Sequence, residues 1–140
     1  MRPLFRLLIS FALLAATSAW SQAYPNRPVR LVVPYGTGGV SDIMGRVVAQ
    51  KMTELLGQPM VVENRPGAGG MLGTGGVARS EADGYTIVLS SLSAYAIGPR
   101  LVKQPPYDPV ADFTAIGWPR SSVIFCATTR PMMSETPPVP

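Results

Sequence analysis

The chain has 140 residues, with 12 lysines and arginines against 8 aspartates and glutamates, one cysteine and no histidine. This length gives room for one domain at most. The basic residues are scattered singly, which argues against a nucleic-acid partner. Without histidine the chain cannot form a serine–histidine or cysteine–histidine pair or the usual zinc sites, and Cys126 alone cannot form an internal disulfide. We expect no metal site and no cofactor.

Residues 1–23 have the layout of a secretory signal peptide. Two arginines precede an apolar run over residues 7–16, and small residues follow up to Ala23. The run is about half of the roughly 20 apolar residues that span a bilayer, which disfavours a membrane anchor. We expect cleavage after Ala23, with Ala19 as a minor alternative, and a mature protein in the periplasm. Cleavage removes both arginines and lowers the formal net charge from +4 to +2.

The mature chain begins with a strand, a loop and a helix. The β-branched run Val29 to Val33 predicts a buried strand, and a glycine-rich loop follows it. Ser41 and Asp42 are suitable N-caps for a helix whose apolar residues recur at helical spacing from Ile43 to Leu56. Gly57 lies where a C-cap belongs.

The same order then repeats. A strand over 60–63 leads into a glycine-rich loop over 64–70 and a helix over 71–80. Glycines in this helix lower its propensity, so it must be short or be held by packing. A third strand over 85–90 precedes a helical stretch over 96–103. Strands that alternate with helices predict an α/β fold with three parallel strands and helices on both faces of the sheet.

The character of the sequence changes after Gly117. Residues 118–140 are rich in proline and show no sustained hydrophobic period. The run Ser121 to Ala127 favours one strand, whereas the last ten residues are typical of disorder.

Three loops at the carboxyl ends of the predicted strands are rich in glycine or serine. In an open parallel sheet, ligands bind at this edge, where loops meet helix N-termini. Backbone N–H groups, hydroxyls and the partial positive charge of a helix N-terminus suit a carboxylate. The alternative is that these glycines only form tight turns. A dinucleotide site is disfavoured because the glycine pattern over 73–78 does not directly follow a strand.

Several motifs occur in order between Tyr24 and Gly117. They are the segments Tyr24–Pro34, Gly38-Gly39 with Asp42, Val61–Gly70, Asp83–Thr86, and Pro106–Pro109 with Asp112-Phe113. With these motifs the chain resembles the Bug family, the extracytoplasmic solute receptors of tripartite tricarboxylate transporters. The resemblance implies a fold like that of type II periplasmic binding proteins, with residues 24–117 as an incomplete first domain.

The resemblance also implies a function. Receptors of this family close two domains on a small carboxylate and deliver it to membrane permease subunits. The loops after the first strands hold the ligand's carboxylate. Carried over by position, the ligand-binding residues are Tyr35, Gly36, Thr37, Gly38, Gly39, Ser41, Asp42, Gly69, Gly70, Met71, Ser90, Ser91 and Ser93.

Within this set, Gly38 and Gly39 are expected to offer N–H donors, and Ser41 and Ser91 to offer hydroxyls. Asp42 is expected to cap its helix or to order the loop, because a carboxylate would repel an anionic ligand.

Arg65, Thr37 and Met71 lie in or directly after these loops. We expect Arg65 to be solvated or to brace its loop rather than to pair with the ligand. Thr37 and Met71 depart from the proline and the small polar residue that are usual in the family.

The resemblance ends at Gly117, before a second domain. We therefore expect a truncated receptor that binds weakly or not at all, and a frameshift or premature stop is the leading explanation for residues 118–140. The truncation would leave a sheet edge and apolar helix faces exposed. Two alternatives remain: a non-functional product without a ligand, and a secreted hydrolase that uses Ser91.

Overall fold

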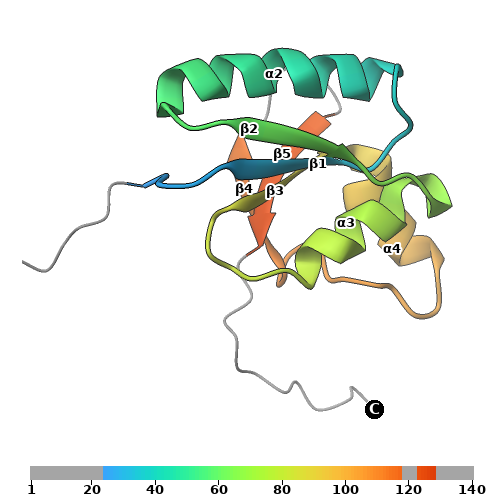
Figure 1. Cartoon of the computed structure of the whole chain (residues 1–140). Coiled ribbons are helices and arrows are strands. Elements are labelled where there is room, and N and C mark those ends of the chain that lie inside the picture. Colours follow the sequence, from blue (N-terminus) through green and yellow to red (C-terminus); the bar gives the residue numbers. More distant parts are fainter. Residues whose placement is uncertain (1–23, 118–122, 129–140) are drawn as a thin grey trace, which may run out of the picture.

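The computed structural model describes residues 24–117 and 123–128, which form a five-stranded sheet between two layers of helices (Figure 1). The strand order is β2-β1-β3-β5-β4. The strands are β1 (Val29–Val33), β2 (Met60–Asn64), β3 (Thr86–Ser91), β4 (Phe113–Gly117) and β5 (Val123–Thr128). The expected signal peptide and the last ten residues lie outside the described residues.

The half of the sheet formed by β1, β2 and β3 is parallel, as predicted. Val29 pairs with Met60, and Arg30 pairs with Thr86. The β-branched residues of β1 place it in the middle of this group, where both faces of the strand are covered.

The other half of the sheet corrects the prediction of a purely parallel sheet. Strand β5 runs antiparallel to both β3 and β4, so the sheet is mixed. The strand expected over 121–127 is found at Val123–Thr128, between β3 and β4. Strand β4 was not predicted: Phe113, Thr114 and Ile116 are typical strand formers, but Ala115 and Gly117 interrupt them and only Phe113 is buried.

Helix α2 (Val40–Leu56) covers one face of the sheet and begins three residues earlier than predicted. Its N-cap is Gly39, whose backbone is extended, so the expectation that Ser41 and Asp42 are caps is wrong. Both residues lie inside the first turn. Gly57 is the C-cap, as predicted, with left-handed backbone and its N–H bonded to the carbonyl of Thr53.

The opposite face of the sheet is covered by short helical segments (Figure 1). These are η1 (Ala68–Gly70), α3 (Met71–Ala78), η2 (Ser93–Ile97) and α4 (Gly98–Leu101). Packing holds α3, as expected for a helix rich in glycine. A Cβ atom at Gly73 would lie 2.8 Å from the Cβ of Pro34, so only glycine allows α3 to approach the end of β1 this closely.

Each face of the sheet has its own apolar core. Leu31, Ile87 and Leu89 face α2, whereas Val32 and Val88 face α3. Strand alternation explains this division, because successive side chains of a strand point to opposite faces.

The outer face of α2 exposes apolar side chains. Val40, Ile43 and Val47 are 76%, 57% and 59% exposed and recur at helical spacing. Exposed apolar helix faces were expected, and α2 confirms this. Among the described residues, no helix combines the length and apolar character that crossing a membrane requires.

Candidate functional site

The loops that follow β1, β2 and β3 meet at one edge of the sheet. The hydroxyl groups of Tyr35, after β1, and Ser91, at the end of β3, are hydrogen-bonded. Gly70 packs against Tyr35 and Ala94: a Cβ atom there would be 2.9 Å from the Cβ of Ala94 and 3.0 Å from Oη of Tyr35. The sequence prediction that these loops lie together is therefore confirmed. We call this contact of Tyr35, Gly70 and Ser91 the loop junction.

The surface groups of the loop junction are neutral. The Oγ atoms of Ser91 and Ser93 lie 2.7 Å apart, so Tyr35, Ser91 and Ser93 form a chain of hydroxyls. The N–H of Ala94 donates to the same Ser91 oxygen at 3.3 Å. Hydroxyls of this kind can turn their hydrogen toward an acceptor, which suits an anionic oxygen.

The first loop leads from Tyr35 into the N-terminus of α2. Its residues Gly36, Thr37, Gly38 and Gly39 are exposed, and Ser41 is half-buried. No side chain caps the first turn of α2. The first N–H groups of a helix have no partner within the helix, and the helix dipole gives them partial positive charge. This end of α2 can therefore accept an anion.

Asp42 lies beneath this loop as a buried carboxylate with three hydrogen-bond donors. Its Oδ2 accepts from the N–H of Gly38 at 2.8 Å and from Nε of Arg46 at 3.1 Å, and its Oδ1 accepts from Nδ2 of Asn64 at 3.0 Å. The Gly38 N–H, followed by Arg46 and Asn64, lowers the pKa of Asp42 to about 2. Of the two roles expected for Asp42, ordering the loop agrees with these contacts.

The expectation for Gly38 is wrong, because its N–H is donated to Asp42 and not to the outside of the loop. Its φ of +79° is left-handed, which favours glycine at this position. Gly38 thus shapes the loop.

The second loop supplies Gly69, Gly70 and Met71. Gly69 and Gly70 have φ of +63° and +96°, and Gly70 is buried at the loop junction. Met71 is half-buried and packs beside Gly98, where an added Cβ would lie 2.8 Å from its sulfur. This side of the junction is therefore apolar.

Ser90 does not share the exposure of its neighbours. Its side chain is fully buried, and its hydroxyl lies 3.2 Å from that of Thr74 in α3. Because Ser90 and Ser91 are adjacent in a strand, their side chains point to opposite faces, and only Ser91 reaches the loop junction.

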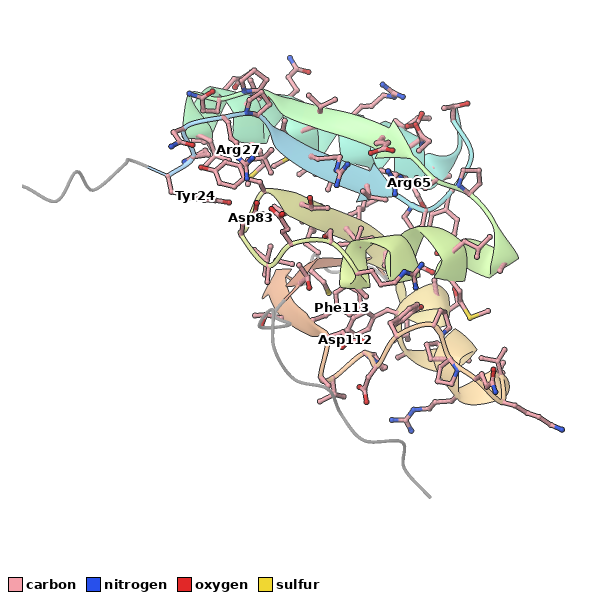
Figure 2. The ribbon with its side chains drawn as sticks, turned by 60° about the horizontal axis from the view of Figure 1, so that its bottom comes forward. Tyr24, Arg27, Arg65, Asp83, Asp112 and Phe113 are labelled. Carbon is pink, nitrogen blue, oxygen red and sulfur yellow. The ribbon has the colours of Figure 1, made fainter. Side chains whose placement is uncertain are left out.

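Arg65 braces its loop, as expected, through a 2.6 Å hydrogen bond from Nε to Glu63. It lies at the opposite end of the parallel strands from Tyr24, Arg27 and Asp83 (Figure 2). Its charge is therefore balanced by a carboxylate of the chain itself.

Sequence reasoning missed two residues of this region, Arg46 and Asn64. Both bind Asp42, and Arg46 lies one helical turn after it. The i, i+4 spacing of Asp42 and Arg46 was a usable signal, whereas nothing in the sequence indicated Asn64. Among the described residues, no group of three or more histidine, cysteine, aspartate or glutamate side chains could hold a metal ion.

Comparison with known proteins decides the family. Residues 44–131 match the model of the tripartite tricarboxylate transporter family receptor. The chain belongs to this family. The match between the chain and the family model extends past Gly117, so the expectation that the resemblance ends at Gly117 is wrong.

The relatives of this receptor chain are much longer. It is 43% identical to protein BugT of Bordetella pertussis over 117 residues, which are 79% of this chain and 36% of BugT. It is 43% identical over 105 residues to a UPF0065 protein of Cupriavidus necator, covering 74% of this chain and 32% of that protein. The chain thus spans about a third of the length of these relatives.

Solved structures confirm the fold as that of a periplasmic binding protein. The periplasmic binding protein BugD has 46% identity and a TM-score of 0.64, over 67% of this chain and 31% of BugD. MatC from Rhodopseudomonas palustris with bound malate has 36% identity and a TM-score of 0.63, over 66% of this chain and 32% of MatC. Rpa4515 of R. palustris with adipate has the same identity and TM-score, over 66% of this chain and 31% of Rpa4515.

Proposed function

We propose that this chain is the carboxylate-binding part of a periplasmic solute receptor, which delivers a small organic acid to the permease subunits of a tripartite tricarboxylate transporter. The observation that carries the proposal is the loop junction. It joins the neutral hydroxyls of Tyr35 and Ser91, and Tyr35 begins the loop that leads into the uncapped N-terminus of α2. The role is binding rather than chemical conversion, in keeping with a family of receptors.

The chemistry of these groups favours a carboxylate. N–H and O–H donors satisfy the oxygens of an anion without a paired cation, and hydrogen bonds to a charged acceptor are stronger than neutral ones. The proposed contact residues are Tyr35, Gly36, Thr37, Gly39, Ser41, Gly69, Gly70, Met71, Ser91 and Ser93. Gly38 shapes the first loop through its N–H bond to the carboxylate of Asp42, which lies beneath the loop.

The solved relatives support a small dicarboxylate as the ligand class. Malate is bound to MatC and adipate to Rpa4515. This chain covers only about a third of these relatives, so residues outside it would form the other side of the binding site. We therefore expect this chain alone to bind its acid weakly.

A substitution at Gly39 tests the proposal without disturbing the fold. A Cβ atom at Gly39 would have its nearest neighbour at an ordinary 3.5 Å, and the backbone there has φ −77°. Aspartate and asparagine are both favoured N-caps, so both variants should be as stable as the wild type or more stable. Only Gly39→Asp places a negative charge where the ligand carboxylate is expected.

The measurement is isothermal titration of the purified chain with malate, adipate, citrate and glutamate. We expect the wild type to give heat of binding with at least one acid. Gly39→Asp should lose this heat, and the matched control Gly39→Asn should keep most of it. Equal binding by both variants would place the carboxylate elsewhere. Absence of binding by the wild type for every acid would favour the non-functional product.

A further inference from the structure

Three side chains hold the loop after β1 from below. Asp42 and Arg46 come from α2, and Asn64 ends β2. Arg46 donates from Nη2 to Oδ1 of Asn64 at 3.3 Å, and both side chains also donate to the Asp42 carboxylate. We call these three residues the Asp42 clamp.

The Asp42 clamp holds the loop at two points. Asp42 accepts the N–H of Gly38, and Asn64 donates from Nδ2 to the carbonyl of Tyr35 at 3.1 Å. The same amide nitrogen of Asn64 donates to Asp42 at 3.0 Å. A shift of Asn64 would therefore release the Tyr35 end of the 35–38 loop and remove a donor from the carboxylate that holds the Gly38 end.

We propose that Asn64 and Arg46 are positioning residues, which fix the 35–38 loop in the shape that meets the ligand without touching the ligand themselves. The ligand part of this inference rests on the proposed function, whereas the loop part rests on the contacts alone. The route to the site is short, because Tyr35 carries both the carbonyl that Asn64 binds and the hydroxyl that binds Ser91.

The two positioning residues act through different physics. Asn64 is neutral and acts through geometry. Without it, the Tyr35 carbonyl and one oxygen of the buried Asp42 carboxylate each lose a hydrogen-bond donor. An acceptor left without a donor destabilises the loop in this shape. Arg46 also balances the charge of Asp42, which lies only one turn inside the helix N-terminus proposed to receive an anion. An unbalanced carboxylate there would repel the ligand, and a dianion more than a monoanion.

The first experiment measures loop order without any ligand. Amide hydrogen exchange is followed by NMR in the wild type, Asn64→Ala, Arg46→Met and the control Lys51→Met. Lys51 lies on the same helix and also pairs with an acid, Glu54, at 2.7 Å, but far from the loop. We expect Gly38 exchange to accelerate by on the order of tenfold in the first two variants and to stay unchanged in the control.

Exchange of Val88, in the buried centre of β3, is followed in parallel, because it reports global unfolding and shows whether a variant also loses overall stability. Unchanged Gly38 rates in both Asn64→Ala and Arg46→Met would overturn the inference, whether or not the chain binds an acid.

The second experiment titrates the same variants with malate, a dianion, and lactate, a monoanion. We expect Asn64→Ala to weaken both acids by a similar factor, on the order of tenfold, and Arg46→Met to weaken malate more than lactate. Wild-type affinity in Asn64→Ala would overturn the positioning role. A wild type that binds neither acid, together with accelerated Gly38 exchange in the variants, would overturn the proposed function and leave the loop-holding role intact.

Discussion

The two ends of the parallel strands are built from different chemistry. At the amino end, Arg27 forms an ion pair with Asp83 and lies 4.2 Å over the ring of Tyr85, which also contacts Tyr24 edge-on (Figure 2). At the carboxyl end, the loops after β1 and β3 present glycines and hydroxyls above the buried charge of Asp42, and the charged side chains of Arg65 and Glu63 pair with each other at the end of β2.

This difference separates a structural end from a candidate binding end. Charged and aromatic side chains at the amino end find partners within the chain and fasten residues 24–28 to the 83–85 turn. At the carboxyl end, the balanced Asp42 leaves neutral donors at the surface. A site for an anion needs N–H or O–H groups that are not already bonded to acceptors of the chain. An arginine in an ion pair has fewer such groups left for a ligand.

Among substitutions that test the difference between the two ends, Gly70→Ala should change the free energy of unfolding most. The new Cβ would meet Ala94 and Tyr35 at 2.9 and 3.0 Å, with φ at +96°, and should lower the free energy of unfolding by about 2 kcal/mol. Gly69→Ala is the matched control, since φ is +63° there but no atom lies within 4 Å, and it should cost about 1 kcal/mol. Urea denaturation measures both. Equal losses would mean that the loops are not in close contact.

A smaller effect is expected from Arg27→Met at the amino end. Loss of the ion pair and of the contact with Tyr85 should lower the free energy of unfolding by about 1 kcal/mol and leave carboxylate binding unchanged. Lys51→Met removes one exposed ion pair with the same change in charge and should cost about 0.3 kcal/mol. A change in ligand affinity in Arg27→Met would contradict the separation of the two ends.

Asp42 also makes the stability of the fold depend on pH in acid. Because the pKa of Asp42 is lowered to about 2, the unfolded chain takes up a proton first as the pH falls. The stabilisation is complete above the ordinary aspartate pKa of about 3.9 and is lost as the pH falls through about 2. Asp42→Asn should therefore flatten the dependence of unfolding free energy on pH in this window.

Asp108→Asn provides a comparison for this prediction. The N–H groups of Ala111 and Val110 lower the pKa of Asp108, so this variant should also flatten the pH dependence. Only Asp42→Asn should accelerate exchange of the Gly38 amide. Unfolding free energies measured from pH 2 to 7 that run parallel in the wild type and Asp42→Asn would contradict the assignment.

Local signals predicted much of the fold and the general place of the site. The β-branched run of β1, the helical spacing of α2 and the cap Gly57 were found as expected. The three glycine- or serine-rich loops also meet where parallel strands must place them. Glycine requirements at Gly70 and Gly73 could not be predicted, because they depend on which atoms approach from other segments.

The sequence by itself determined the parallel three-stranded unit, its covering helices and the polar character of the loop edge, because these follow from hydrophobic period and turn residues within short windows. Only the tertiary structure decided that β5 enters the sheet between β3 and β4, that Ser90 turns inward, and that Asn64 joins Asp42 and Tyr35. Strand order, register and long-range donor pairing set these features. They depend on contacts between segments that are far apart in the sequence, and a local sequence pattern does not predict such contacts.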